Sequence, residues 1–424
     1  MTHILDELAW RGLLAQTTDE QALREALSAG PVTVYCGFDP TAPSLHHGNL
    51  VQLILLRHLQ LAGHRVLALV GGATGMIGDP RMSGERVLNT KETVAAWVER
   101  LREQISRILD LDGENPATLV NNLDWTGDLR AIDFLRDIGK HYRLGTMLAK
   151  DTVARRLASE EGISFTEFSY QILQGMDYLE LFRRHGCTLQ TGGNDQWGNL
   201  LSGVELIRKA DHGTAHALTT PLITKSDGTK FGKTEGGAVW LAPDMMTPYA
   251  FYQFWVNTDD ADVVAYLRTF TFRSPDEIAE LERSVVEKPQ AREAQRALAR
   301  DVTALVHGPD AAAKVIAASQ ALFGRGDLAE LDAGTLAAAV AELPSAPLTQ
   351  EGAAVVDLLV AAGLVAGRGA ARRAIADGGV SVNNTRVTDE EAVLGVEELL
   401  HGRFAVLRRG KRTLAVAELV AEEA

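Results

Sequence analysis

The sequence predicts an α/β protein with a mainly parallel sheet, followed by an α-helical region and a small α+β module. Short β-branched segments alternate with helical segments over roughly the first half of the chain, which is typical of βαβ units. Strand signals then disappear from residues 247–322, where helical patterns follow one another. Residues 352–424 mix short helices and short strands around Gly378-Gly379, which predicts a separate small module.

The composition is that of a folded globular chain with several domains. Its 424 residues are 46% hydrophobic and 23% charged, which excludes a mostly disordered protein and suggests about two to three domains. The net charge of −14 means that any nucleic-acid contact must come from a local basic patch. Two cysteines, Cys36 and Cys187, exclude a disulfide framework and a cysteine-rich zinc site. We therefore expect a protein of the reducing cytoplasm, and we assign no residue to a metal site.

No targeting or membrane segment is expected. The N-terminal residues are acidic and lack the basic start of a signal peptide. The longest near-apolar run, residues 66–78, contains several glycines and is too short to span a bilayer.

Local patterns predict the elements of the α/β region. Residues 31–37 form a β-branched run that ends in glycine, which indicates a buried strand. Residues 47–62 carry leucines at helical spacing and are followed by Gly63, which can end a helix. Similar patterns predict further strands at 65–71, 117–121 and 187–191, and further helices at 90–109, 129–138, 165–182 and 195–209.

The rest of the chain divides into a helical region, a linker and the terminal module. Ser274-Pro275-Asp276-Glu277 is a helix start, with Ser as the cap, Pro at the first position and Glu closing a capping box. Residues 331–351 are rich in Ala, Pro, Ser and Thr and are predicted to form a linker. Beyond it we expect short helices at 353–362 and 369–376 and short strands at 380–382 and 404–407.

The first candidate site runs from Tyr35 to Asn49 and joins the first strand to the first helix. In an open parallel sheet, ligands bind where strands end, and a helix N-terminus attracts phosphate through its unpaired N–H groups and its dipole. Two histidines and Thr41 could add donors, and Gly48 would let a planar ring approach the backbone. The alternative is a plain connection with solvated histidines.

The second candidate is the loop from Lys225 to Thr234, which carries three lysines between glycines. Such a loop could close over a polyphosphate and release it. It ends in Gly-Lys-Thr like a P-loop, but the P-loop pattern requires glycine where this chain has Asp227, and no helix start follows Thr234. We therefore exclude a P-loop. The alternative is a solvated surface loop.

A polar row on one expected helix is the third candidate. Tyr170, Gln174 and Asp177 are spaced at i, i+4 and i+7 and therefore share one face. The alternative is that this row faces water, although it contains no Lys or Arg. The opposite face is apolar and carries Phe165, Phe168, Ile172, Met176 and Leu179.

Two glycine-rich strand ends are the fourth and fifth candidates. The fourth, residues 190–199, carries Gly193 and Asp195 just after the strand at 187–191, and an acidic residue at such a strand end can hold ribose hydroxyls. A helix cap would explain the same residues. Residues 71–80 follow the second strand but lack the G-x-G-x-x-G spacing of a dinucleotide site, and a simple glycine-rich turn explains them equally well.

A basic set in the terminal module is the sixth candidate. On a chain with a net charge of −14, clustered arginines on a small α+β module indicate contact with RNA phosphates. A solvated face is the alternative. The set comprises Arg368, Arg372, Arg373, Arg386, Arg403, Arg408, Arg409, Lys411 and Arg412.

Taken together, these segments resemble the bacterial tyrosyl-tRNA synthetases, a family of class I aminoacyl-tRNA synthetases. The resemblance covers nearly the whole chain. His46-His47-Gly48-Asn49 corresponds to the HIGH motif, and Lys230-Phe231-Gly232-Lys233-Thr234 corresponds to the KMSKS motif. The terminal module is similar to an S4-type RNA-binding domain. Further matching segments are residues 35–42, 71–79, 165–170 and 193–199.

The resemblance implies an activity and a division of the chain. ATP and L-tyrosine would give tyrosyl-adenylate and pyrophosphate, and tyrosine would then pass to the 3′ end of tRNA(Tyr). Mg²⁺ would accompany ATP, and the family acts as a homodimer. The implied parts are a Rossmann-like catalytic domain (1–222), a KMSKS-type loop and connector (223–246), an α-helical anticodon-side domain (247–330), the linker (331–351) and an S4-like RNA-binding domain (352–424).

The resemblance also implies roles for residues at matching positions. The tyrosine site would comprise Tyr35 and Asp177 at the phenol, Tyr170, Gln174 and Asp79 at the ammonium group, and Gln196 near the carboxylate. The ATP site would comprise Gly37, Asp39, His46, Gly48 under the adenine, Asn49, Gly193 and Asp195 at the ribose, and Lys233. The residues implied in catalysis are Thr41, His46, Lys230, Lys233, Thr234 and Arg86, assisted by Arg81. The implied tRNA contacts are Arg368, Arg372, Arg373, Arg386, Arg408, Arg409 and Lys411.

Two positions depart from the family pattern, and two other functions remain as alternatives. The HIGH-type motif ends in Asn49, which can donate a hydrogen bond to ribose but carries no charge. The KMSKS-type loop contains Phe231-Gly232 and keeps both lysines. A tryptophan-specific relative is disfavoured by the S4-like tail and by the pair Tyr35 and Asp177. An RNA-binding protein without catalysis would have lost the lysines or the polar row.

Overall fold

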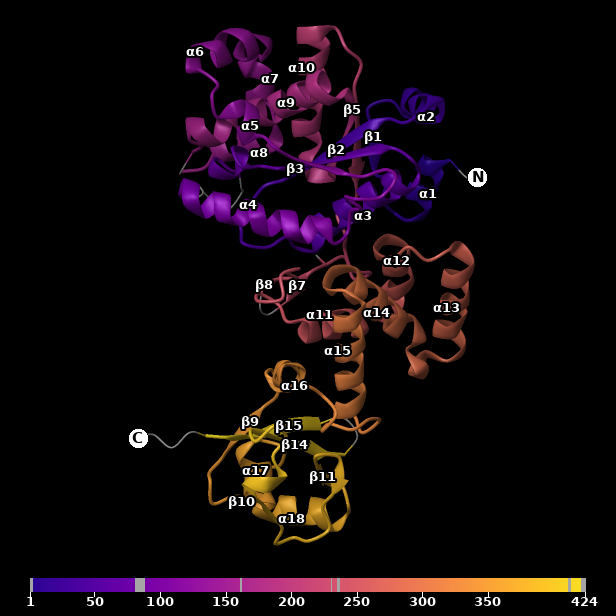
Figure 1. Ribbon diagram of the computed structural model, residues 1–424, viewed down its shortest axis with the longest axis vertical. Coiled ribbons are helices and arrows are strands. Elements are labelled where there is room, and N and C mark those ends of the chain that lie inside the picture. Colours follow the sequence, from indigo (N-terminus) through magenta and orange to yellow (C-terminus); the bar gives the residue numbers. More distant parts are fainter. Residues whose placement is uncertain are drawn as a thin grey trace. The chain divides into compact units, whose positions relative to one another are not determined.

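The chain folds into two compact units, shown in a computed structural model (Figure 1). The first comprises residues 1–246 and 258–298, and the second comprises 247–257 and 299–424. The structure describes residues 3–80, 88–160, 162–229, 231–234, 237–410 and 413–420, with the backbone alone at 151–152 and 233–234. The candidates Arg81, Arg86, Lys230, Lys411 and Arg412 lie outside these residues.

A six-stranded sheet forms the centre of the first unit. Across the sheet its strands are β1 (Gln16–Thr17), β6 (His216–Thr220), β5 (Cys187–Gly193), β2 (Thr33–Phe38), β3 (Arg65–Val70) and β4 (Thr118–Asn121). Neighbouring strands are parallel except β1, which pairs antiparallel with β6. Because β3 and β5 flank β2 on opposite sides, the chain connections diverge there. A ligand crevice is therefore expected at the carboxyl ends of β2 and β5.

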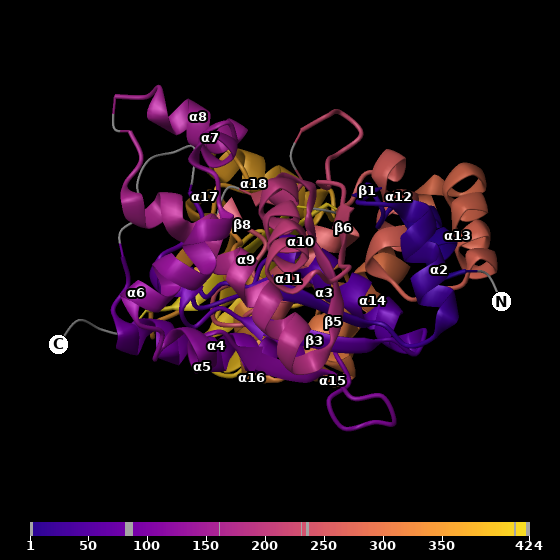
Figure 2. The same ribbon diagram turned by 90° about the horizontal axis from the view of Figure 1, so that it is seen from above.

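Helices cover both faces of this sheet (Figures 1 and 2). The first face is covered by α3 (His47–Leu61) and α4 (Lys91–Ser106), and the second by α9 (Phe165–His185) and α10 (Trp197–Asp211). Helix α9 begins after Ser164, whose side chain accepts a hydrogen bond from the backbone N–H of Glu167, and it ends at Gly186 with φ 61°. The predicted α/β region with a parallel sheet is confirmed.

Shorter elements complete the first unit. Two helices, α1 (Ile4–Trp10) and α2 (Glu20–Ala29), precede the central strands. The sheet is followed by the ribbon of β7 (Lys233–Thr234) and β8 (Gly237–Ala238) and by α12 (Asp260–Phe270) and α13 (Pro275–Glu287). Between β4 and α9 lie α5 (Leu123–Thr126), α6 (Ala131–Asp133), a π-helical turn (Phe134–Ile138), α7 (Leu144–Leu148) and α8 (Asp151–Leu157).

The first unit also contains elements that differ from the prediction. The sequence does not predict β1, which has two residues, or β6, which lacks a continuous β-branched run. All of β6 is nevertheless buried, because it pairs in parallel with β5. The helix predicted at 129–138 is only partly α-helical, since α6 covers three residues there and a π-helical turn continues it to Ile138.

The second unit combines helices with a small sheet. Its helices before the sheet are α11 (Pro248–Val256), α15 (Pro309–Leu322) and α16 (Ala333–Val340), while α14 (Glu293–His307) spans the boundary between the units. The five-stranded sheet has the order β12 (Thr385–Arg386), β11 (Val380–Val382), β14 (Phe404–Arg409), β15 (Thr413–Leu419) and β9 (Ser345–Leu348). The strands β10 (Ala353–Ala354) and β13 (Val393–Leu394) form a separate pair.

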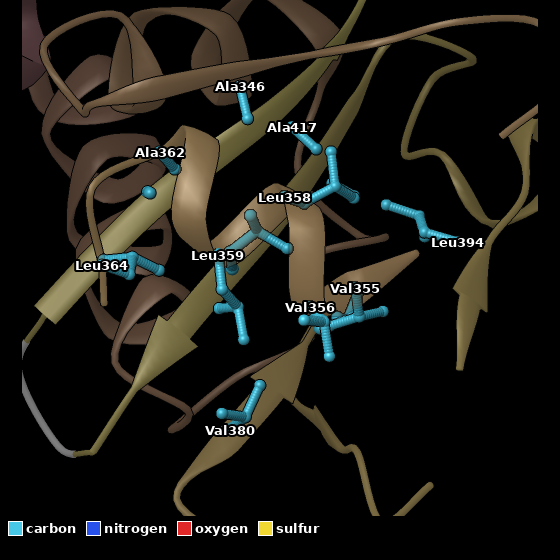
Figure 3. Close-up of a cluster of buried hydrophobic side chains, with 14 of the residues drawn as sticks. Ala346, Val355, Val356, Leu358, Leu359, Ala362, Leu364, Val380, Leu394 and Ala417 are labelled. Carbon is cyan, nitrogen blue, oxygen red and sulfur yellow. The ribbon is translucent and has the colours of Figure 1, made fainter. Parts of the chain in front are cut away.

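The terminal module has its own apolar core (Figure 3). Helices α17 (Val355–Ala361) and α18 (Arg368–Ala376) pack together, and α17 also packs on β9. These helices and the strands beyond them agree with the predicted elements. The core includes Val355, Val356, Leu358 and Leu359 of α17 together with Ala346, Val380 and Ala417 of the strands.

Residues 331–351, predicted as a linker, contain α16 and β9. Strand β9 pairs in parallel with β15 and buries Ala346 and Leu348. This segment is therefore part of the folded unit rather than an unstructured connection. Its Ala, Pro and Ser content concealed a strand that is defined by pairing with residues about 70 positions further along the chain. Within the described ranges, no helix is long and apolar enough to cross a membrane.

Candidate active site

The first unit contains a pocket at the carboxyl ends of β2 and β5, with a volume of about 590 Å³. Parallel strands end at one edge of a sheet, so residues from distant segments converge there. Five of the six predicted candidate segments therefore open onto one pocket. The predicted tyrosine- and ATP-site residues whose side chains or glycine backbone the structure describes all line it: Tyr35, Gly37, Asp39, Thr41, His46, Gly48, Asn49, Asp79, Tyr170, Gln174, Asp177, Gly193, Asp195 and Gln196.

A tyrosine hydroxyl and a carboxylate lie buried in the pocket wall. Tyr35 is 1% exposed, and its hydroxyl has no hydrogen-bond partner among the described residues. Asp177 is 3% exposed and accepts hydrogen bonds from Asn122 Nδ2 at 2.9 Å and Trp125 Nε1 at 2.8 Å. Burial raises the pKa of Asp177 to about 7, although these two donors oppose the rise. This wall can therefore both donate to and accept from a hydroxyl group of a ligand.

The polar row of α9 faces the pocket rather than water. Tyr170 is buried and donates its hydroxyl hydrogen to Asp39 Oδ2 at 2.6 Å. Asp39 also accepts from Thr74 Oγ1 at 2.6 Å. Gln174 Oε1 is buried without a partner among the described residues. The alternative of a solvated row is therefore wrong, and α9 presents polar atoms to a ligand.

A hydrogen-bonded carboxylate lies at the beginning of α10. Asp79 accepts from Gln196 Nε2 at 3.1 Å and from Asn199 Nδ2 at 3.3 Å. Asn199 Nδ2 also donates to Gln196 Oε1 at 2.7 Å, and Asn199 Oδ1 accepts from the ammonium group of Lys150. Asp79 follows β3 and Gln196 follows β5, so the tertiary fold brings the two together.

The N-terminus of α3 is organised by its own motif residues. His46 is the N-cap, and its Nδ1 accepts from the backbone N–H of Gly48 at 3.0 Å. Asn49 Oδ1 accepts from the backbone N–H of His46 at 3.1 Å and closes a capping box. Burial lowers the pKa of His46 and lowers that of His47 to about 4, so both rings are neutral near pH 7. An anion here would meet helix N–H groups and neutral donors rather than imidazolium charges.

The lysine loop and the segment that follows it lie beside the same helix. Backbone hydrogen bonds join His47 N–H to Val239 at 3.0 Å and Leu241 N–H to Leu45 at 2.9 Å. Phe231 is 5% exposed and contacts the His47 ring edge-on, with centroids 5.3 Å apart. The alternative of a fully solvated loop is therefore wrong at Phe231.

A glycine is required at the next position of the loop. Gly232 has φ +77°, and a Cβ atom there would lie 2.0 Å from Cε1 of His47. The backbone of Lys233 and Thr234 follows directly in β7. The loop backbone that carries these two residues therefore runs close to α3.

The comparison with known families agrees with this geometry. Residues 27–324 match the model described as tRNA synthetases class I (W and Y). The chain belongs to this family. Residues 335–417 of the synthetase match a second model, the tyrosine–tRNA ligase SYY-like C-terminal domain.

Individual relatives extend over the same length. The synthetase is 64% identical over 420 residues to a tyrosine–tRNA ligase of Streptomyces coelicolor, covering 99% of each chain. It is 60% identical over 422 residues to a tyrosine–tRNA ligase of Mycobacterium tuberculosis, covering 98% of this chain and 99% of that one. It also matches a crystal structure of a C-terminally truncated mitochondrial tyrosyl-tRNA synthetase of Aspergillus nidulans. That match has a TM-score of 0.68 and 31% identity, and it covers 74% of this chain and 92% of the other.

Several polar residues at the site of the synthetase were not predicted. Asn122 and Trp125 hold Asp177, and they follow the strand predicted at 117–121. Polar residues at the end of a parallel strand are the signal that could have found them. Lys150 was also missed, and Asn199 was given no role although it ends the matching segment 193–199, because neither position stands out without knowledge of their contact.

The basic set of the synthetase's terminal module is largely engaged within the protein. Arg368 pairs with Asp357 at 2.5 Å, Arg372 with Glu391 at 2.8 Å and Arg403 with Glu418 at 2.8 Å. Arg408 donates to Ser381 Oγ at 3.2 Å, and Arg409 donates to the Leu364 carbonyl at 2.7 Å. Arg373 and Arg386 are exposed, as are Arg368, Arg372 and Arg403, but the side chains of Arg373 and Arg386 have no ion-pair or hydrogen-bond partner among the described residues. Their contact with RNA remains a prediction.

Proposed function

We propose that this pocket is where the chain, acting as a tyrosine–tRNA ligase, joins L-tyrosine to ATP and then transfers the tyrosyl group to tRNA(Tyr). The observation that carries the assignment is the buried pair of Tyr35 and Asp177 in the pocket whose other wall is the N-terminus of α3. The relatives named above, at 60% and 64% identity, are tyrosine–tRNA ligases. A phenol at the pair would complete hydrogen bonds that the protein leaves open at Tyr35.

Selection of tyrosine follows from the same pair. The phenol hydroxyl donates to Asp177 and accepts from Tyr35. Phenylalanine lacks this hydroxyl, so its binding would leave both buried polar groups without the partner they need. Tryptophan is disfavoured because its indole ring offers one donor and no acceptor to the hydroxyl of Tyr35. The amino-acid head group would then lie toward Tyr170, Gln174, Asp79 and Gln196.

Adenylate formation needs positioning and charge stabilisation rather than a general base. A carboxylate oxygen of tyrosine forms a bond to the α-phosphorus of ATP, and the bond to the bridging oxygen breaks. The electron pair leaves with pyrophosphate. We assign ATP, entering as its Mg²⁺ complex, to the N-terminus of α3, with Thr41 and His46 at the phosphates, Gly48 and Asn49 near the nucleoside, and Gly193 and Asp195 at the ribose.

The lysine loop would act on the leaving group. Lys230, Lys233 and Thr234, with Arg86, would contact the pyrophosphate as negative charge builds on it. Groups that engage most strongly in the transition state raise the rate rather than the ground-state affinity. The close approach of Gly232 to His47 supports this assignment, since it brings the loop to the phosphate-binding end of α3.

Amino-acid-dependent exchange of pyrophosphate into ATP tests the proposal. We expect exchange with tyrosine and at least a thousandfold less with phenylalanine or tryptophan, a discrimination of about 4 kcal/mol. Exchange driven by tryptophan would favour a tryptophan-specific enzyme. Absence of exchange with all three amino acids, together with retained RNA binding, would favour a non-catalytic RNA-binding protein.

We further propose that the terminal module, residues 352–424, binds tRNA through its accessible arginines. The helical region at 247–330 would lie on the anticodon side. Replacing both Arg373 and Arg386 by Ala should weaken tRNA binding and leave pyrophosphate exchange unchanged. Arg368→Ala is the matched control, because that guanidinium is already paired with Asp357 and should contribute less.

We also propose that the chain acts as a homodimer. Large apolar side chains are exposed on the segment between β4 and α9, and Figure 2 shows α6, α7 and α8 along one side of the first unit. Such exposure is typical of a protein interface. Phe165→Asp should convert the dimer into monomers in sedimentation experiments, whereas Val286→Asp on α13 should not. The exposed residues are Leu123, Ile132, Leu135, Leu144, Leu148, Leu157 and Phe165.

A cytoplasmic location is our remaining proposal. Cys36 and Cys187 are both free thiols, and both are buried, in keeping with a reducing compartment.

A further inference from the structure

A fully buried amide joins the two residues assigned to the head group of tyrosine. Asn199 lies in the first turn of α10 and is 1% exposed. Its Nδ2 donates to Asp79 Oδ1 at 3.3 Å and to Gln196 Oε1 at 2.7 Å, while its Oδ1 accepts from the ammonium group of Lys150. Neither Asn199 nor Lys150 lines the pocket, so both act on it through other residues.

We propose that Asn199, held by Lys150, is a positioning residue that orients Asp79 and Gln196 toward the α-ammonium and α-carboxylate groups of tyrosine. This inference rests on the proposed function, since it takes the head group to bind at Asp79 and Gln196. Lys150 and Asn199 lie behind these two side chains and select one orientation of each.

The polarity of the hydrogen bonds carries the argument. An ammonium group can only donate, so Lys150 requires the oxygen of the Asn199 amide to point toward it. The Asn199 nitrogen must then point toward Asp79 and Gln196, where both acceptors lie. Because Gln196 accepts through Oε1, its Nε2 is directed to Asp79, at 3.1 Å. One cation thus determines the orientation of two amides in succession.

These hydrogen bonds present the Asp79 carboxylate and the Gln196 amide nitrogen to the ligand in one orientation. Each oxygen of Asp79 receives one of these hydrogen bonds, and a carboxylate oxygen can accept more than one. Gln196 Nε2 keeps its second N–H for a carboxylate. If either amide turned around, an oxygen would face the Asp79 carboxylate, and the arrangement would repel rather than hold it.

The position of Lys150 is itself constrained. Its aliphatic chain lies against Gly198, where an added Cβ would come within 3.1 Å of Lys150 Cε. Burial lowers its pKa, while the negative charges of Asp79 and Asp195 favour the charged form. The cation is therefore held where a donor is needed.

Ligand analogues separate positioning from general support of the fold. In the full chain, we would measure binding of tyrosine and, by competition, of p-cresol, which has the phenol but no head group. Asn199→Ala should weaken tyrosine about 10- to 100-fold, because hydrogen bonds to charged groups are affected. It should change p-cresol affinity less than about twofold. In pyrophosphate exchange, the KM for tyrosine should rise and the KM for ATP should stay unchanged.

Three further variants complete the test. Lys150→Met should also lower the affinity for tyrosine selectively, by a smaller factor, and Lys150→Arg should restore most of that affinity. Both variants keep Asn199 in place, so they test the proposal even if Asn199→Ala does not fold. Asn115→Ala is the matched control, because it removes an amide that donates to two backbone carbonyls far from the pocket and should leave both affinities unchanged.

Equal losses for tyrosine and p-cresol, or no loss for tyrosine, would overturn the inference while leaving the proposed function intact. Failure of the unmodified chain to bind tyrosine would overturn both.

Discussion

Removing the hydroxyl of Tyr35 should weaken tyrosine binding without weakening the fold. This hydroxyl is buried in the pocket wall and has no hydrogen-bond partner among the described residues. Tyr35→Phe therefore breaks no hydrogen bond within the described protein. It does remove the bond that we assign to the substrate phenol.

The size of the effect follows from the neutral character of this hydrogen bond. Burial, with the nearby charge of Asp177, raises the pKa of Tyr35 well above 10, so the hydroxyl is a neutral donor. A neutral hydrogen bond contributes about 0.5–1.5 kcal/mol net, which corresponds to about a 2- to 13-fold increase in the Kd for tyrosine. Phenylalanine cannot use the hydroxyl, so its affinity should stay the same or rise. The ratio of the two affinities should therefore fall by the same factor.

Tyr178→Phe is the matched control. Tyr178 packs beside Tyr35 with ring centroids 5.1 Å apart, is equally buried, and donates to the carbonyl of His216 at 2.8 Å. Its hydroxyl serves the fold, so this variant should lose about 1 kcal/mol of stability, a fall in Tm of a few degrees, and should bind tyrosine normally.

Thermal denaturation without ligand and calorimetric titration with tyrosine and phenylalanine measure both quantities. If Tyr35→Phe melts as low as Tyr178→Phe while the tyrosine-to-phenylalanine ratio is unchanged, the assignment of Tyr35 to the phenol is wrong.

Three further perturbations test other parts of the site. Tyrosine affinity should rise as the pH increases through about 7, because the Asp177 carboxylate, with a pKa raised to about 7, accepts the phenol hydrogen best when ionised. Binding titrations from about pH 5.5 to 8.5 should show this rise, and Asp177→Asn should make the affinity independent of pH. A fall in affinity with rising pH would contradict the assignment. In the absence of tyrosine, the folded protein keeps Asp177 protonated between about pH 4 and about pH 7, whereas the unfolded chain does not. The contribution of Asp177 to the free energy of unfolding should therefore decrease as the pH rises from about 4 to about 7. Gly232→Ala should slow adenylate formation at least tenfold with little change in tyrosine affinity, because the new Cβ would collide with His47; a normal single-turnover rate would refute the described loop path. Lys233→Ala should likewise slow adenylate formation and leave the tyrosine Kd within about twofold, and equal losses in rate and affinity would exclude its role at the leaving group.

Much of the fold was predictable because local patterns of hydrophobic spacing and helix capping determine it. The strand at β2 has a β-branched run, and α3 has leucines at helical spacing, and both appear within a residue or two of the predicted bounds. Helix α13 begins at the predicted capping box of Ser274 and Glu277, whose partners are three residues apart. Such signals lie within a few residues of one another, so they are visible before the chain folds.

The errors occurred where pairing with distant residues decides the structure. Strand β6 has weak local signals and is defined by its pairing with β5. Strand β9, within the segment predicted as a linker, is likewise defined by β15. Strand formation depends on neighbours more than on intrinsic preference, so these segments could not be recognised from their own composition.

The sequence by itself determined which side chains stand at strand ends and helix starts, because alternation of strands and helices follows from local hydrophobic periodicity. The tertiary structure alone decided which of those ends share a pocket and which side chains are hydrogen-bond partners there. Asn122 and Trp125 bind Asp177, and Asn199, itself bound by Lys150, binds Asp79. Hydrogen-bond partners separated by about 50 to 120 residues leave no periodic trace in the chain. They meet only after parallel strands have been aligned, since it is the sheet that brings their ends to a common edge.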